Sequence, residues 1–189
     1  MGLNMEVFHA INNLANKNAA LDSFMIFCSK YLPYIFALTI VIVFLLGMIK
    51  GEILYRKMAV STVVFTIINL IISFIIGQFV YSPRPFVNNK VNLLYYHAPD
   101  TSFPSDHATA TMSIALGFGM FSKAIGWIFT ILSVLVGVSR IYVGHHYPTD
   151  VIGAYILVII TSLIYNRFLK TRVSNIYECI ETKIMKVIK

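Results

Sequence analysis

Three short clusters of polar residues combine side chains that bind phosphate with side chains that transfer protons. The first is Arg84-Pro85, the second runs from Pro104 to His107, and the third contains Ser139-Arg140, His146 and Asp150. Guanidinium groups form paired hydrogen bonds with phosphate oxygens, and imidazoles act as nucleophiles or as general acids and bases. Together these residue types are suited to breaking a phosphate ester.

The third cluster joins the end of one apolar segment to the start of the next. Arg140 ends the first segment, and Pro148 stands where a helix would begin. His146 precedes Asp150 by four residues, so the carboxylate can accept a hydrogen bond from the imidazole Nδ1–H. That bond would leave Nε2 unprotonated and oriented, as a nucleophile requires.

The other two clusters each have a structural interpretation as well as a functional one. Arg84 lies between two prolines, where it either marks the exit from a membrane segment or holds a phosphate. Ser105 and Asp106 precede a run of small residues and either cap that helix or leave its N-terminus open to an anion. His107, in the first turn, would lie beside such an anion.

The elements that position these clusters are apolar and long. The chain has 189 residues, of which 58% are hydrophobic and 12% charged, and this composition excludes an ordinary soluble domain. Met58 to Val80 contains no charge in 23 positions and would span about 34 Å as a helix. We therefore predict an all-α, multi-pass transmembrane helix bundle with about five spans. The other four spans are Ala20 to Met48, His107 to Phe121, Ala124 to Val143 and Thr149 to Phe168.

Two amphipathic segments flank the bundle. Val7, Phe8 and Ile11 recur at helical spacing opposite Asn12, which predicts an interfacial helix that anchors the N-terminus. The tail shows the same pattern with basic residues on its other faces. We expect a membrane-embedded phosphatase domain over residues 1–170 and an amphipathic tail over 171–189, with no catalytic role for either flanking helix.

Basic residues predict the orientation of the chain. The net charge of +7 is interpreted as a topology signal, and no nucleic-acid partner is expected. With five spans, ten of the fifteen Lys and Arg residues lie on one side, which should be cytoplasmic. The C-terminus would then be cytoplasmic, while the N-terminus and all three clusters would face outside the cell membrane. The ten are Lys50, Arg56, Lys57, Lys123, Arg167, Lys170, Arg172, Lys183, Lys186 and Lys189.

The clusters resemble the three signature motifs of the type-2 phosphatidic acid phosphatase superfamily, over about residues 5 to 170. The Pro-Ser-Asp-His form and the segment Val143 to Pro148 are similar to bacterial undecaprenyl-diphosphatases associated with bacitracin resistance. The resemblance implies a polyprenyl diphosphate substrate, a phosphohistidine intermediate and no metal or other cofactor. It implies the following roles: His146 as nucleophile, Asp150 as its orienting partner, His107 as general acid and base, and Arg84, Ser105 and Arg140 as phosphate ligands. Supporting positions beside them are Ser139, His145 and Asp106.

Two positions depart from the family pattern. The first motif usually begins with a lysine seven residues before the arginine, and that position is Gly77. The second usually has glycine where Asp106 stands, and a carboxylate there should repel phosphate unless it pairs or turns away. The role of Asp106 is left open.

Three alternatives remain at this point. The lipid could be phosphatidic acid or phosphatidylglycerol phosphate, because the headgroup chemistry is the same. His107, His146 and Asp150 could hold a metal ion, although two fixed arginines disfavour this site. An anion or lipid transporter would need polar groups through the whole membrane, and here the charges gather at one end.

Overall fold

The computed structural model describes residues 2–188, with side chains described through residue 184. Its regular elements are helices, and among these residues the only strand-like pairing is an isolated bridge between Pro83 and Thr101. Four helices are long and apolar enough to cross a membrane, which confirms the predicted multi-pass helical bundle. They are α3 (Leu32–Ile49), α4 (Ile53–Phe79), α7 (Lys123–Tyr142) and α8 (Pro148–Phe168).

The predicted first span is two helices. α2 (Ala19–Lys30) and α3 are separated at Tyr31, next to Pro33 in the first turn of α3. A proline has no N–H and is tolerated only in a first helical turn, so the long apolar segment breaks there. Asn18 caps α2 by accepting hydrogen bonds from the N–H groups of Ala20 and Leu21.

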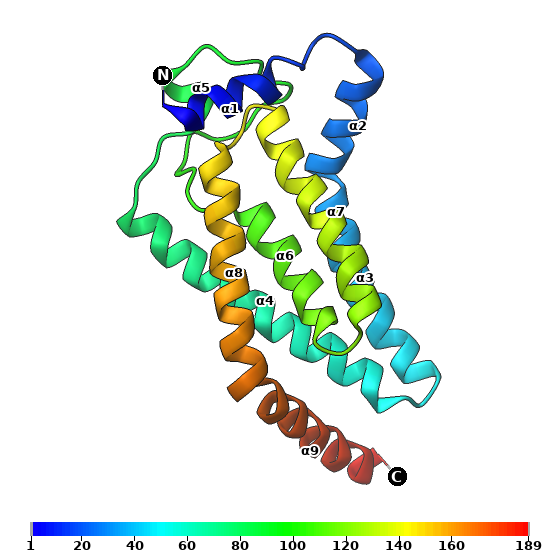
Figure 1. The fold of residues 1–189 in the computed structure, drawn as a ribbon. Helices are drawn as coiled ribbons and strands as arrows, with labels where there is room; N and C mark the ends of the chain where they lie inside the picture. Colours follow the sequence, from blue (N-terminus) through cyan, green and yellow to red (C-terminus); the bar gives the residue numbers. More distant parts are fainter. Residues whose placement is uncertain (1, 189) are drawn as a thin grey trace.

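The predicted third span is the short helix α6 (Asp106–Gly119) at the centre of the bundle (Figure 1). Its 14 residues rise only about 21 Å, less than the hydrocarbon thickness, so α6 depends on its neighbours to reach both ends. Nine of these residues are buried against α4, α7 and α8. α6 is thus a central, tightly packed helix, and it is shorter than the four long helices.

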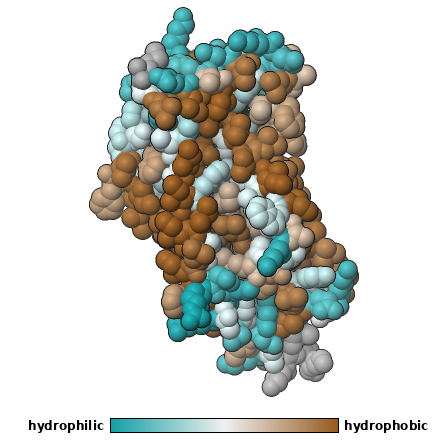
Figure 2. All heavy atoms as spheres, viewed as in Figure 1, coloured by the Kyte–Doolittle hydropathy of each residue, from teal (hydrophilic) through white to brown (hydrophobic). Residues whose placement is uncertain are grey.

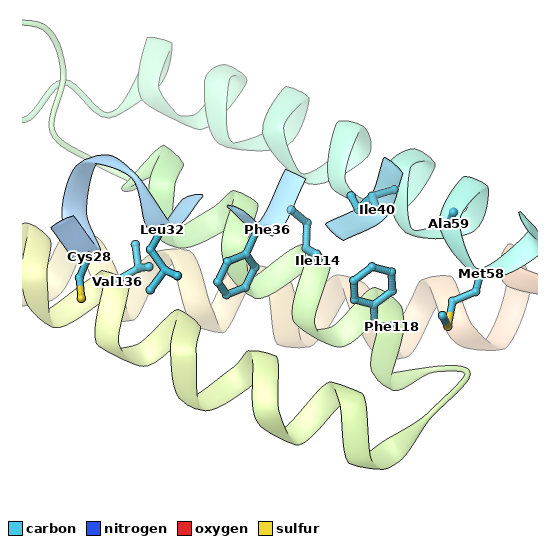
Figure 3. Close-up of a cluster of buried hydrophobic side chains, with 9 residues drawn as sticks. All are labelled: Cys28, Leu32, Phe36, Ile40, Met58, Ala59, Ile114, Phe118 and Val136. Carbon is cyan, nitrogen blue, oxygen red and sulfur yellow. The ribbon is translucent and has the colours of Figure 1, made fainter. Parts of the chain in front are cut away.

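Small residues let α6 approach its neighbours closely. A Cβ on Gly126 of α7 would lie 2.5 Å from the Gly119 Cα, and a Cβ on Gly117 would lie 2.8 Å from Thr62 of α4. Hydroxyl groups add bonds between helices, including Thr111 to Ser133 at 2.9 Å. One core cluster joins five helices around Phe36, Ile114 and Phe118 (Figure 3).

The N-terminal helix α1 (Leu3–Asn12) lies across one end of the bundle (Figure 1). Asn12 is not on a solvated polar face as the sequence suggested; it is fully buried. Its amide donates to the carbonyls of Tyr142 (2.8 Å) and Asn92 (2.9 Å), and its Oδ1 accepts from the Asn92 N–H. Gly144, with φ of +86°, passes so close to Asn92 that a Cβ would meet its carbonyl at 2.9 Å. We call this arrangement the Asn12 clamp.

The C-terminal helix α9 (Lys170–Ile188) packs against α4 at the opposite end. Arg56 pairs with Glu181 at 2.7 Å and Lys57 pairs with Glu178 at 2.6 Å. Ile176, Ile180 and Ile184 remain exposed, as expected for an amphipathic interfacial helix. A hydrophobic band lies between two hydrophilic ends of the molecule (Figure 2).

Candidate active site

The three motif clusters meet at the end of the bundle covered by α1. Two backbone contacts hold them together: Ser102 N–H donates to the Ser82 carbonyl at 2.7 Å, and Ser105 N–H donates to the Asp150 carbonyl at 3.2 Å. The segment before Arg84 is thus tied to the 89–105 loop, and that loop is tied to the start of α8. Residues distant in sequence are fixed in one site by backbone geometry.

His146 is buried, and its Nδ1 lies 2.9 Å from the Ser102 carbonyl oxygen. A carbonyl oxygen only accepts, so Nδ1 carries the proton and Nε2 has the free lone pair. The Asp150 carboxylate lies farther away, 3.5 Å from Nδ1. The predicted direct bond from His146 to Asp150 is therefore replaced by a bond to a backbone carbonyl, although the predicted tautomer is retained.

Asp150 is itself held by two donors. Its Oδ2 accepts from the Tyr147 N–H at 2.8 Å, which caps α8, and from the Ser102 hydroxyl. A carboxylate at a helix N-terminus interacts favourably with the helix dipole. Asp150 thus stabilises the start of α8 and also lies beside His146.

Arg84 contacts the nucleophile candidate directly. Its Nη1 lies 2.9 Å from Nε2 of His146 and 3.1 Å from the His145 carbonyl, while Nε pairs with Asp100 at 2.6 Å. Only 5% of Arg84 is exposed. Arg84, predicted as a phosphate ligand, thus lies beside His146.

Arg140 is buried and only partly paired. Nη1 donates to the Tyr95 hydroxyl at 2.9 Å and to Ser29 Oγ at 3.1 Å, whereas Nε and Nη2 have no hydrogen-bond partner. The Ser105 hydroxyl is also buried without a partner, and it makes no capping bond to α6. Buried donors without acceptors are costly, so this group is suited to an anion. Ser105 stands at the N-cap position of α6, but its side chain does not cap the helix.

The remaining predicted residues differ in their placement. The half-buried ring of His107 has no hydrogen-bond partner among the described residues. Asp106 is exposed and accepts from Ser73 of α4 at 2.9 Å. Ser139 bonds to Val136 within its own helix, so its hydroxyl has a structural contact only. His145 donates from Nε2 to the Tyr95 carbonyl at 3.0 Å and packs against Tyr95 and His97.

His145 and His146, in the loop between α7 and α8, are both held neutral. Burial, followed by the charge of Arg140, lowers the pKa of His145 to about 2. The same causes, with Arg84 added, lower the pKa of His146 well below its usual value. A neutral imidazole with a free Nε2 is the form that attacks an electrophile.

Gly77 has a steric explanation. A Cβ there would lie 3.1 Å from Thr101 Cγ2 and 3.3 Å from the Phe103 carbonyl. The 89–105 loop packs directly on α4 at this position, so a lysine side chain would require the loop to move. The loop therefore occupies the space that the usual motif lysine would need.

Four contributors to this site were not predicted from the sequence. They are Ser29, Tyr95, Asp100 and Ser102, which bond to Arg140, Arg84, His146 or Asp150. Three of them lie in the 89–105 loop. The position of this loop between the first two motifs was the one sequence feature that could have indicated that it contributes to the site. No group of three or more His, Cys, Asp or Glu side chains within the described residues is placed to share a metal ion.

Two cavities lie away from these residues. One of about 330 Å³ is lined by residues such as Lys123, Trp127 and Asn166 near the end opposite α1. The other, of about 260 Å³, is lined by apolar side chains of α3 and α4. The candidate site is defined here by its side-chain contacts.

Residues 58–174 match the PAP2 superfamily. This chain belongs to that superfamily. The family predicted from the three motifs is confirmed, and the chain is a phosphatase with helices able to span a membrane.

Named relatives and a solved structure are similar to this chain over most of its length. The chain is 37% identical over 190 residues to "Undecaprenyl-diphosphatase BcrC" of Bacillus subtilis (strain 168), covering 97% of this chain and 96% of that one. It is 33% identical over 162 residues to "Bacitracin transport permease protein BcrC" of Bacillus licheniformis, covering 85% and 78%. The crystal structure of Aquifex aeolicus LpxE is similar, with a TM-score of 0.75 and 26% identity, covering 89% of this chain and 97% of that one.

Proposed function

We propose that this protein removes the terminal phosphate of undecaprenyl diphosphate, giving undecaprenyl phosphate, at the outer face of the cell membrane. The observation that carries the proposal is the group of unpaired buried donors on Arg140 and Ser105, in the same site as His146, whose unprotonated Nε2 is contacted by Arg84. The name of the Bacillus subtilis relative supports the choice of lipid. A membrane-embedded site suits a substrate whose polyprenyl chain stays in the bilayer.

Phosphate binding comes first. The terminal phosphoryl group accepts hydrogen bonds from Nε and Nη2 of Arg140 and from Ser105 Oγ. Nη1 of Arg84 then exchanges its contact with His146 Nε2 for a phosphate oxygen, since one lone pair cannot both accept that bond and attack phosphorus. Removing a comparable donor costs about 10²- to 10³-fold in rate.

Two transfers complete the reaction. Nε2 of His146 forms a bond to phosphorus while the bond to the bridging oxygen breaks. His107, protonated while the anionic substrate lies beside it, gives that proton to the departing lipid monophosphate. Water then attacks the phosphohistidine, His107 takes a proton from it, and inorganic phosphate leaves. Asp150, 3.5 Å from Nδ1, stabilises the positive imidazole of the intermediate.

The distribution of charge supports the outward orientation. Lys50, Lys123 and Lys170 lie at the end of the bundle opposite the site, where the positive-inside rule places the cytoplasm. The site would then face outside, with α1 over it.

The test is phosphate release by protein purified in detergent, with a chelator present. We expect wild type to release phosphate from undecaprenyl diphosphate and His146→Ala to release none, while His9→Ala, in α1, stays active. Full activity of His146→Ala would refute the assignment. Phosphatidic acid and phosphatidylglycerol phosphate form the comparison panel, and faster release from either would reassign the lipid.

The intermediate is tested separately. A substrate labelled in its terminal phosphate should transfer label to the wild-type protein in an acid-labile, base-stable form, as expected of a phosphoramidate. Labelled protein in His146→Ala would place the covalent step on another residue.

A further inference from the structure

We propose that Ser102 is the positioning residue of the His146–Asp150 pair. This inference rests on the proposed phosphohistidine reaction, but not on the identity of the lipid. Ser102 lies in the 89–105 loop, outside the residues assigned from the motifs, and is fully buried. It contacts both members of the pair.

Each polar group of Ser102 has a separate partner. Its carbonyl accepts from Nδ1–H of His146 at 2.9 Å, its hydroxyl donates to Oδ2 of Asp150, and its N–H donates to the Ser82 carbonyl at 2.7 Å. Ser102 thus links the nucleophile, the carboxylate and the segment that leads to Arg84.

The hydroxyl proton has one suitable acceptor. Ser102 Oγ is also 3.4 Å from Nδ1 of His146, but that nitrogen already carries a proton and cannot accept one. The hydroxyl therefore directs its proton to Asp150 and holds the carboxylate 3.5 Å from the imidazole. Without this bond, Tyr147 N–H would be the only remaining donor to Asp150 among the residues that the structure describes.

The contacts of Ser102 should affect the chemical step of the reaction. When His146 carries the phosphoryl group its ring is positive, and Asp150 is the carboxylate beside it. Ser102 makes no contact with the unpaired donors of Arg140 that are assigned to phosphate. Loss of its hydroxyl should lower kcat and leave KM nearly unchanged.

The experiment is a double-mutant cycle with Ser102→Ala and Asp150→Asn, using whichever lipid phosphate the wild-type protein cleaves. We expect Ser102→Ala to lower kcat about 10- to 100-fold, as loss of an orienting partner of a histidine typically does. In the Asp150→Asn background, the same change should lower kcat by no more than about 3-fold, because the hydroxyl acts through the carboxylate. Ser113→Ala is the matched control, since Ser113 is equally buried and its hydroxyl bonds only within α6.

Fully multiplicative effects in the double variant, or a raised KM with unchanged kcat, would overturn the proposal. Thermal unfolding in detergent separates misfolding from positioning. If Ser102→Ala does not purify folded, the cycle is run with Ser102→Cys, which keeps a weak donor and should retain part of the rate. Failure to cleave undecaprenyl diphosphate while another lipid phosphate is cleaved would refute the proposed substrate alone, and the cycle would still decide the role of Ser102.

Discussion

Arg140 is oriented in the site by two residues outside the motifs. Tyr95 and Ser29 both bond to Nη1, and they are themselves bonded to each other at 2.8 Å. The guanidinium is thereby fixed in rotation, with Nε and Nη2 left for phosphate oxygens. An arginine oriented before the substrate arrives loses less side-chain entropy on binding.

Tyr95→Phe tests this orientation. The variant loses one hydrogen bond to a charged group, worth about 1.5–3 kcal/mol, so we expect kcat/KM for phosphate release to fall about 10- to 100-fold. Tyr96→Phe is the neighbouring control, because Tyr96 is 81% exposed and should lose no activity. Equal activity of both variants would show that Ser29 alone orients Arg140.

The neutral state of His145 predicts how stability depends on pH. In the unfolded chain this ring binds a proton near pH 6.5, whereas in the folded protein its pKa is about 2. Between these values the unfolded state binds more protons, so stability falls as pH falls, by at most about 1.4 kcal/mol per pH unit for one group. We expect Tm in detergent to decrease from pH 7 to pH 5.

His145→Gln should reduce that decrease. His146 contributes in the same direction, so some decrease should remain. Identical Tm profiles for wild type and His145→Gln would contradict the role of His145.

At the residue scale, side-chain chemistry indicated the charged groups but not their neighbours. His146, Asp150, Arg84 and Arg140 were predictable because each has a distinctive spacing and function. Ser102 was not, since a backbone carbonyl has no sequence signature and a single serine carries little information. The shift from a His–Asp bond to a His–carbonyl bond has the same cause.

The end of α6 and the start of α7 approach each other closely at Gly119 and Gly126. A Cβ at Gly126 would lie 2.5 Å from the Cα of Gly119, and backbone atoms cannot rotate away. This contact fixes α6 relative to α7, and thereby His107 relative to Arg140.

Gly126→Ala should therefore destabilise the protein by about 1–3 kcal/mol, as overpacking typically does. Thermal unfolding in detergent measures the change. Gly2→Ala is the control, because nothing lies within 4 Å of the added atom. An unchanged Tm for Gly126→Ala would show that the two helices separate at little cost.

At the element scale, hydropathy predicted the long helices well because lipid contact requires continuous apolar sequence. It also predicted a short span at His107 to Phe121, close to the 14 residues of α6, whose burial among helices removes the need to match the bilayer. The burial of Asn12 was unpredictable, because its partners are backbone carbonyls distant in sequence.

The whole molecule has two hydrophilic ends that differ in their contents (Figure 2). One end contains the candidate site and α1, and the other contains α9 and its pairs with α4. The predicted orientation can therefore be tested by cysteine labelling, because Cys179 in α9 is exposed whereas Cys28 is buried.

On intact cells, a membrane-impermeant maleimide should leave Cys179 unlabelled and should label a Tyr96→Cys variant. After permeabilisation, Cys179 should also react. Labelling of Cys179 on intact cells would reverse the orientation and place the site in the cytoplasm.

The Asn12 clamp also constrains when the protein becomes active during its synthesis. Asn12 leaves the ribosome early, yet its partners follow 80 and 130 residues later. The clamp can close only after α7 has entered the membrane, so a nascent chain lacks the finished site. A partly inserted protein therefore does not expose a working phosphatase to the lipid pool.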